Sequence, residues 1–413
     1  MRIGLQTWGS EGDIRPVVAL AEALVARGHC VELVVTLLGT VELPASRDGL
    51  LITQVPAGPP ADLAAFTARL GPQPSSWGML KALFRELFIP LIPEMEIAAA
   101  RLVANNDLLI GHFAVHPLQA AARGARKPYA SVMYMPGLIP TALQPPHPLP
   151  NLGRRLNPWL WRLAGWKLDR ELLAVCRESF TRVGLPLAHI LPDAWTSPTL
   201  NLVAASPAFW PPPSDWPAQH RMTGEFISAR PLDALPEQLE AFLRAGDPPL
   251  YLGLGSPQQC RPEEATALLA EAARLSGRRA IVRSLAAAHP PWTVSGNILW
   301  GGPVDHRALF PRCAAVVHHG GAGTTHAAAR AGVPAVAVTF LDEQGAWAGA
   351  LRRAGIAPKH LHYRQATPLR LAQRISEALR PERCAAARQV AQSMRQENGT
   401  ATACHLLEAL LDR

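Results

Sequence analysis

The sequence predicts an α/β protein built from two doubly wound parallel sheets, and three observations lead to this expectation. Apolar runs of strand length alternate with helical patterns along most of the 413 residues. The runs are continuous rather than alternating in polarity, as expected for parallel strands that are covered on both faces. A chain of this length also exceeds one ordinary hydrophobic core, so two domains are expected.

The N-terminal half contains the first series of apolar runs. RIGLQT reads as a strand that leads into a glycine turn. PVVALAEALVARG then has helical spacing, with Gly28 as its C-cap. VELVVT reads as the next strand, and further strands are expected at residues 107–112, 129–134 and 200–205.

A second series begins at residue 249, with strands expected at PLYLGLG, RAIVRS, NILWGG, AAVVHH and PAVAVT. Between the two series, a proline-rich stretch breaks both helix and strand. We therefore expect one domain over residues 1–212, a connection over 213–226 and a second domain over 227–413. The last helix is free to pack back on the first domain.

Composition excludes several classes of protein. The chain is 48% hydrophobic and 17% charged, and its apolar runs stay below the roughly 18 residues of a membrane span. Its start lacks the apolar centre of a secretory signal, so a cytoplasmic location is expected. The net charge of +8 is dispersed, which suits anionic small molecules rather than nucleic acid. Six separated cysteines without a CxxC pair predict neither a metal cage nor a disulfide framework.

A glycine-rich turn follows two histidines in AVVHHGGAGTTHAAARAGVPAVAV. Gly320, Gly321 and Gly323 let a ligand approach the backbone closely. The helix that begins there offers unpaired N–H groups and a partial positive charge, which suit a phosphate or diphosphate. No DxD motif occurs, so the role of a cation is expected to fall to His319 and the helix N-terminus.

Other nucleotide-binding motifs are incomplete. GLGSPQ and GAGTTH have Gln258 and His326 where the dinucleotide fingerprint requires its third glycine. The GxxxxGK[ST] loop of nucleoside triphosphatases is absent from the sequence. Dehydrogenase and triphosphatase functions are therefore disfavoured.

The first turn, TWGSEGDIRP, combines close backbone approach with a carboxylate. Gly9 and Gly12 let a ligand approach the backbone closely, and Ser10 adds a hydroxyl. Asp13 lies at the carboxyl edge of the strand, where such sheets bind ligands. A carboxylate suits removal of a proton from a hydroxyl nucleophile. Asp is also common at a helix start, and Pro16 is able to begin that helix.

GSEGDIRP, NILWGGPVDHRALFPRCAAVV and VVHHGGAGTTHAAARAGVP together resemble the family 1 glycosyltransferases of the GT-B fold, in their bacterial natural-product, sterol and rhamnolipid branch. The resemblance covers nearly the whole chain. It implies an acceptor-binding first domain and a nucleotide-sugar donor-binding second domain.

The implied reaction is an inverting transfer of a hexose without metal or cofactor. Its expected donor is UDP-glucose, and its expected acceptor is a hydroxyl of a lipophilic molecule such as a sterol, polyketide, flavonoid or hydroxy fatty acid. A dTDP-deoxysugar such as rhamnose stays an alternative donor. A nucleotide-sugar 2-epimerase and an inactive helper of a partner glycosyltransferase stay alternative functions.

The resemblance also implies roles for individual residues. Asp13 matches the catalytic base, and His112 lies where some relatives place a partner for that base. His319 matches the histidine that contacts the donor diphosphate, and Trp8 is expected to wall the acceptor site. The other implied donor-binding residues are Ser10, Gly12, Ser256, Val304, Gly320, Gly321, Gly323, Thr324, Thr325, Glu343 and Gln344.

Three positions depart from the family pattern or carry a second interpretation. Glu343 stands where the family usually has Asp, and Asp342 is able to compete for its role. Ala327 stands where plant relatives carry a ribose-binding glutamate. His318 is expected to be structural.

Two apolar segments carry scattered arginine and lysine, WGMLKALFRELFIPLIPEM and NPWLWRLAGWKLDR. The resemblance implies that they line an apolar acceptor cleft. Ordinary helix packing and peripheral contact with a membrane surface are kept open. The chain is expected to be a monomer or a weak homodimer.

Overall fold

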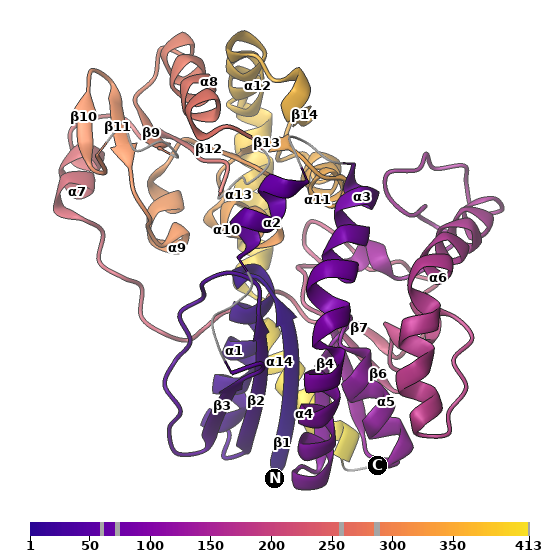
Figure 1. The fold of residues 1–413 in the computed structure, drawn as a ribbon. Helices are drawn as coiled ribbons and strands as arrows, with labels where there is room; N and C mark the ends of the chain where they lie inside the picture. The colour runs from indigo at the N-terminus through magenta and orange to yellow at the C-terminus, as the bar shows by residue number, and fades with distance from the viewer. Residues whose placement is uncertain (58–61, 71–74, 256–259, 285–289, 412–413) are drawn as a thin grey trace.

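The computed structural model contains two seven-stranded sheets flanked by helices (Figure 1). The described residues are 1–57, 62–70, 75–255, 260–284 and 290–411. This architecture confirms the predicted pair of doubly wound α/β domains.

The first sheet has the strand order β3-β2-β1-β4-β5-β6-β7, and its neighbouring strands run parallel. Its strands are β1 (Arg2–Gly9), β2 (Cys30–Leu37), β3 (Leu50–Gln54), β4 (Leu108–His112), β5 (Tyr129–Met133), β6 (Leu200–Val203) and β7 (His220–Met222). The helices of this half are α1 (Glu11–Ala26), α2 (Leu63–Arg69), α3 (Ser76–Ala82), α4 (Ile92–Asn105), α5 (His116–Gly124) and α6 (Asn157–Arg182).

The second sheet has the order β10-β11-β9-β8-β12-β13-β14, in which the β10–β11 pair is antiparallel. Its strands are β8 (Leu250–Leu252), β9 (Ala280–Arg283), β10 (Thr293–Ser295), β11 (Ile298–Gly301), β12 (Ala315–His318), β13 (Ala335–Thr339) and β14 (Leu361–His362). The helices of this half are α7 (Glu237–Arg244), α8 (Pro262–Leu275), α9 (His306–Leu309), α10 (Ala322–Ala331), α11 (Asp342–Arg353), α12 (Pro368–Ala378), α13 (Pro381–Arg395) and α14 (Gly399–Leu411).

Every strand that the sequence predicts is present, and the structure adds β3, β7, β10 and β14. Strand β7 lies inside residues 213–226, the stretch assigned to the inter-domain connection. Because β7 pairs with β6, the first sheet extends into this stretch, and the connection between the sheets starts after Met222.

The carboxyl ends of the first sheet point toward the second domain, since the N-terminus lies at the far end of β1 (Figure 1). Helix α14 returns from the second domain and packs along α1 (Figure 1). Glu408 on α14 joins Arg27 through an Nη2–Oε2 distance of 2.6 Å and His29 through an Nε2–Oε1 distance of 3.0 Å. The last helix thus ties the two halves together.

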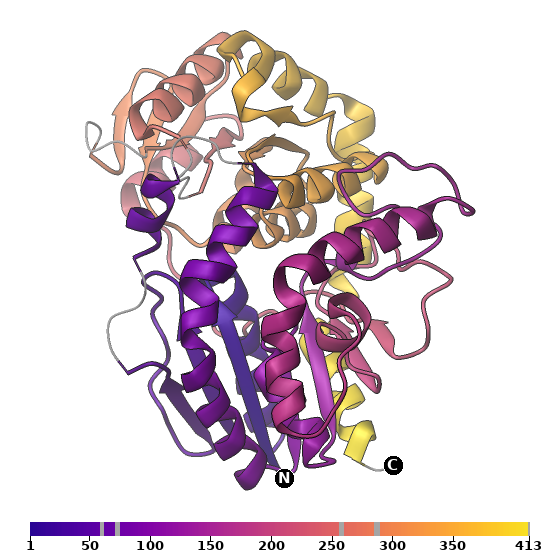
Figure 2. The same cartoon turned by 45° about the vertical axis from the view of Figure 1, so that its right-hand side comes forward.

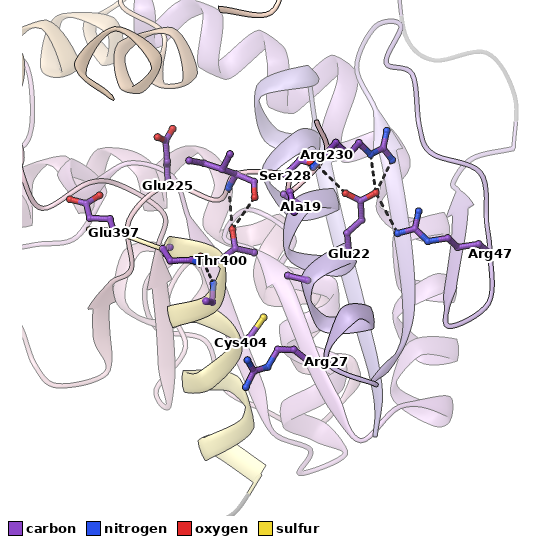
Figure 3. Close-up of a pocket in the computed structure, with 16 residues that line it drawn as sticks. Ala19, Glu22, Arg27, Arg47, Glu225, Ser228, Arg230, Glu397, Thr400 and Cys404 are labelled. Atoms are coloured by element: carbon purple, nitrogen blue, oxygen red, sulfur yellow. Dashed lines mark hydrogen bonds and ion pairs between the residues drawn. The ribbon is translucent and has the colours of Figure 1, made fainter. Parts of the chain in front are cut away.

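A cavity of about 630 Å³ lies beside the inter-domain connection, between α1 and α14 (Figure 3). The Thr400 hydroxyl accepts from the Ile227 N–H at 3.1 Å and donates to the Ile227 carbonyl at 3.3 Å. Glu22 of α1 binds Arg230 at 2.7 Å. These contacts hold the connection against the first domain, well away from the start of α1.

Among the described residues, no helix is both long enough and apolar enough to span a bilayer.

Candidate active site

Asp13 lies in the first turn of α1, because that helix starts at Glu11. Pro16 lies inside the same helix. The Ser10 N–H donates to Asp13 Oδ2 at 2.9 Å, and the Ser10 hydroxyl donates to the same oxygen at 3.2 Å. The first of these contacts belongs to a helix-capping box. Ser10, predicted to bind the donor, therefore holds the Asp13 carboxylate in this structure.

Burial and, to a smaller extent, the negative charge of Glu343 raise the pKa of Asp13 to about 7, against the lowering effect of the Ser10 hydrogen bonds. The side chain nevertheless keeps 34% of its surface exposed. The carboxylate is thus poorly solvated yet still open to a ligand. A group with this pKa is well matched to proton transfer at neutral pH.

His112 ends β4 beside Asp13, with its Nε2 3.8 Å from Asp13 Oδ1. This distance is longer than a hydrogen bond. The Ala114 N–H points to His112 Nδ1 at 3.4 Å, which places the single proton of the neutral ring on Nε2, toward the carboxylate. Burial lowers the pKa of His112 to about 3, so the ring is neutral.

Tyr134 is a neighbour of this site that the sequence did not indicate. Its hydroxyl donates to the Asp13 carbonyl at 2.7 Å, which ties the start of α1 to the segment after β5. Gly9 is required here, because its φ is 139° and a Cβ at this position would meet the Asp13 side chain. A Cβ at Gly12 would meet nothing within 4 Å, so the backbone there faces open space.

Trp8 is packed into the core of the first domain, with 5% of its surface exposed. Its ring centroid lies 4.8 Å from that of Phe88 and 5.8 Å from that of Phe84. The predicted acceptor wall is therefore not presented by Trp8 in this structure, because the helical segment after α3 covers the indole.

In the second domain, the two histidines at the end of β12 have different surroundings. His318 is fully buried, and its Nδ1 accepts from the Gly320 N–H at 3.1 Å, as expected for a structural residue. His319 is half-buried, and its Nδ1 has no hydrogen-bond partner among the residues that the structure describes.

Burial, with a smaller effect from Arg283, lowers the pKa of His319 to about 4. His319 is therefore neutral near pH 7 in this structure, and its expected contact with the donor diphosphate stays a prediction. A neutral imidazole can still donate a hydrogen bond to a phosphate oxygen.

Arg283 places a positive charge near His319 and was not indicated by the sequence analysis. It is the last residue of β9, and its charge lowers the pKa of both His319 and His306. A cation at the carboxyl end of a parallel strand lies on the usual ligand side of the sheet. That position was the signal available in the sequence.

The glycine turn lies between His319 and the start of α10. Gly321 is the N-cap of α10, and Gly323 faces open space. Thr324 is half-buried. Thr325 is fully buried, and its expected donor contact stays a prediction.

Helix α11 closes the other side of this turn. Gly320 has a φ of 88°, and a Cβ there would lie 2.9 Å from the Gln344 carbonyl oxygen. Gln344 Oε1 accepts from the N–H groups of Phe340 at 2.7 Å and Leu341 at 3.1 Å. Gln344 therefore caps α11 and leaves its amide N–H groups to donate elsewhere.

Glu343 and Asp342 stand at the start of α11, facing the first domain. Burial raises the pKa of Glu343, although the residue keeps an exposed surface. The Asp342 N–H donates to the Ser76 hydroxyl of α3 at 2.9 Å, a direct contact between the two domains. The negative charge of Glu343 raises the pKa of Asp13, so the two acidic groups interact across the two domains.

Two predicted donor residues remain. Val304 is half-buried and packs against the core of the second domain, in the segment between β11 and α9. Ser256 lies outside the described residues. The structure thus brings His112 within 3.8 Å of Asp13, and it groups His319, Gly320, Gly321 and Gly323 at the turn before α10.

Comparisons with known proteins identify the family. The family model "Erythromycin biosynthesis protein CIII-like, C-terminal domain" matches residues 267–406. The chain is 32% identical to O-mycaminosyltylonolide 6-deoxyallosyltransferase of Streptomyces fradiae over 429 aligned residues, 99% of this chain and 97% of that relative. It is 31% identical to vancomycin aglycone glucosyltransferase of Amycolatopsis orientalis, over 99% of this chain and 98% of that relative.

Among solved structures, the kitacinnamycin glycosyltransferase matches with a TM-score of 0.70 at 18% identity, over 99% of this chain and 98% of that one. This match supports the fold. Together with the sequence relatives, it shows that the chain belongs to the GT-B glycosyltransferases of family 1, in the group that glycosylates natural products.

Proposed function

We propose that this glycosyltransferase moves a hexose, with inversion and without a metal ion, from a nucleoside diphosphate sugar to a hydroxyl of a lipophilic acceptor. Asp13 takes the hydroxyl proton as the acceptor oxygen forms a bond to the anomeric carbon. The bond from that carbon to the diphosphate oxygen breaks on the opposite face. The sugar leaves the nucleoside diphosphate, which departs with the electron pair.

One arrangement carries this proposal: the Asp13 carboxylate, partly exposed, is held by the Ser10 N–H at 2.9 Å and faces His112 at 3.8 Å, and burial raises its pKa to about 7. A base must be largely deprotonated yet retain affinity for a proton, and a pKa near the working pH meets both requirements. His112 is a positioning residue, since its Nε2 proton faces the carboxylate from a buried and neutral ring.

The leaving diphosphate would be stabilised by three groups. The first amides of α10 provide N–H donors, His319 provides a neutral ring donor, and Arg283 provides charge. Preorganised donors of this kind lower the barrier when they bind the developing charge more tightly than the donor in the ground state.

The sugar would be held by Glu343 and by the amide N–H groups of Gln344. We propose UDP-glucose as the donor, and the name of the vancomycin aglycone glucosyltransferase supports glucose as the sugar. A dTDP-deoxysugar is the second candidate, and the name of the 6-deoxyallosyltransferase supports a 6-deoxysugar. Glu343, one methylene longer than the family's usual Asp, is the residue that we expect to decide between these sugars.

The experiment is a transfer assay with UDP-glucose, dTDP-glucose and dTDP-rhamnose against a panel of sterol, macrolide, flavonoid and hydroxy fatty acid acceptors. The proton coupling of the new anomeric centre reports inversion. Activity that survives chelation with EDTA supports transfer without metal, and a strict requirement for Mg²⁺ contradicts it.

Incubation with the donor alone distinguishes the alternatives. A new sugar nucleotide without acceptor would identify a 2-epimerase. Absence of transfer from every donor, with activity restored to a co-purified glycosyltransferase, would identify a helper protein.

A further inference from the structure

Helix α6 carries a stripe of large apolar side chains on its solvent face. Four side chains in one continuous stretch of the helix region are more than half exposed, at 51%, 64%, 56% and 57%: Leu156, Trp159, Leu163 and Trp166. Just before the helix, Leu149 and Leu152 add exposed fractions of 37% and 49%. Contiguous apolar surface on a water-soluble domain marks an interaction site.

The spacing of these residues makes them one face rather than a random scatter. The steps from Leu156 to Trp159, Leu163 and Trp166 are three, four and three residues, which is the repeat of one helical side. The opposite side of α6 packs into the core of the first domain through Trp161, Leu168, Leu172 and Cys176. Because the opposite face of α6 makes the contacts with the core, the exposed stripe does not contribute to packing within the domain.

Cationic side chains surround this stripe. Residues 151–170 contain five of them, all exposed, and a single acid: Arg154, Arg155, Arg162, Lys167, Arg170 and Asp169. The carboxylate of this acid contacts a histidine, with 2.8 Å between Asp169 Oδ2 and His189 Nδ1. Because five cations stand against one carboxylate, the net charge of the patch is positive.

The cations lie directly on the aromatic residues of the stripe. The guanidinium carbon of Arg162 is 4.9 Å from the centroid of the Trp159 ring, and that of Arg170 is 5.8 Å from the centroid of Trp166. Long cationic side chains of this kind can place their stems along apolar surface and their charged ends among phosphate groups. Tryptophan prefers the boundary between headgroups and acyl chains.

We propose that this face of α6 docks on a membrane surface that contains anionic phospholipids. Figure 2 shows α6 on the outer side of the first domain, with no other element in front of it. A projecting helix with apolar residues along its ridge and cations at its flanks is suited to lie in the headgroup plane. Each cation near an anionic surface adds to the attraction.

The resemblance implied that NPWLWRLAGWKLDR lines the acceptor cleft, but its Trp159, Leu163 and Trp166 side chains lie on the solvent face of α6 and are not among the site residues described above. The test is co-sedimentation of the full chain with vesicles of phosphatidylcholine alone and with roughly 30% phosphatidylglycerol. We expect binding to the anionic vesicles that weakens at high salt. The double variant Trp159→Ser/Trp166→Ser should bind about tenfold or more weakly.

Arg162→Gln/Arg170→Gln should lose affinity for anionic vesicles only. The matched control is Val294→Ser/Leu369→Ser, which alters two side chains of the second domain, each 60% exposed. It should leave vesicle binding unchanged. Melting temperatures within a few degrees of the parent protein show that the variants are folded.

Equal binding to neutral and anionic vesicles, no binding to either, or wild-type binding by the double tryptophan variant would each overturn the proposal. A dimer in light scattering that the tryptophan variant converts to a monomer would also overturn it. In that case the stripe is the contact between two copies of the chain.

Discussion

Replacement of Asp13 by Asn tests the assignment of the base with little structural change. Asn has the shape of Asp, and its side-chain carbonyl can still accept the hydrogen bond that Ser10 N–H donates at 2.9 Å. The helix cap should therefore survive. Only the capacity to take a proton is removed.

The expected loss of turnover follows from that single change. Loss of a general base typically costs about 10²–10⁴-fold in rate. This corresponds to about 2.7–5.5 kcal/mol of activation free energy. Binding of the nucleoside diphosphate should change little, since the groups proposed to hold it lie in the second domain.

Stability should move in the opposite direction to activity. Burial raises the pKa of Asp13 to about 7, so the folded state holds its proton more tightly than the unfolded state does. The stabilising contribution is present below the unfolded pKa and is lost as the pH rises through about 7. Above that pH, Asp13→Asn should therefore melt at the same temperature as the wild type or higher, by an amount that residual solvent exposure reduces.

The assay is kcat/KM as a function of pH, with initial rates of nucleoside diphosphate release. In the wild type, kcat/KM should rise with pH and level off above about pH 7, because the deprotonated carboxylate is the active form. This rise should be absent in the residual activity of Asp13→Asn. Folded Asp13→Asn with turnover within about threefold of wild type would refute the reasoning.

Four further changes probe the second domain and the connection. His319→Ala should weaken UDP or dTDP binding by about tenfold, measured by calorimetry, since it removes one ring donor; unchanged affinity would exclude the contact. Arg283→Gln should weaken the same binding and also flatten its salt dependence, whereas His319→Ala should leave the salt dependence intact. Gly320→Ala should lower the free energy of unfolding by about 1–3 kcal/mol, because φ is 88° and the new Cβ meets the Gln344 carbonyl. Thr400→Val should cost about 1–3 kcal/mol in urea unfolding, because the Ile227 N–H loses its acceptor; an unchanged midpoint would show that the connection does not depend on this bond.

The strands that the sequence predicted are the central ones, and those that it missed lie at the margins. β3 and β7 are the two edges of the first sheet, and β10 and β14 are the two edges of the second. An edge strand has one neighbour and a face toward solvent, so it needs no continuous apolar run. The periodicity that reveals β1 or β12 is therefore absent from these short segments.

The parts of the candidate site that could be predicted from the sequence are those marked by residue type at the end of a strand. The glycine turn after β12 and the carboxylate after β1 follow from residue type and position alone. The start of α1 was not predictable in the same way, because Pro16 was expected to begin the helix and instead lies inside it. Two hydrogen bonds fix that start: the Ser10 N–H donates to the Asp13 carboxylate, and the Tyr134 hydroxyl donates to the Asp13 carbonyl. The second bond joins residues that are 121 positions apart.

Arg283 shows a related difficulty. It becomes part of the site only because β9 and β12 lie on either side of β8 in the sheet, which places its charge near His319. A single arginine at a strand end is common, and only the strand order reveals what it faces. The positive charge near the glycine turn after β12 therefore comes from a residue that no local motif marks.

For the two tryptophan-containing segments as well, the sequence alone does not show which side chains are buried and which are exposed. WGMLKALFRELF covers Trp8, and its Phe84 and Phe88 are buried against the indole. NPWLWRLAGWKLDR has a similar mixture of apolar and cationic residues but forms a helix with apolar side chains on two opposite faces, one buried and one exposed. Helical spacing identifies each face, yet it does not say which face the domain itself covers. The structure shows that the fold covers the Trp161 face of α6 and leaves Trp159 and Trp166 exposed, which is the face that we propose to dock on a membrane.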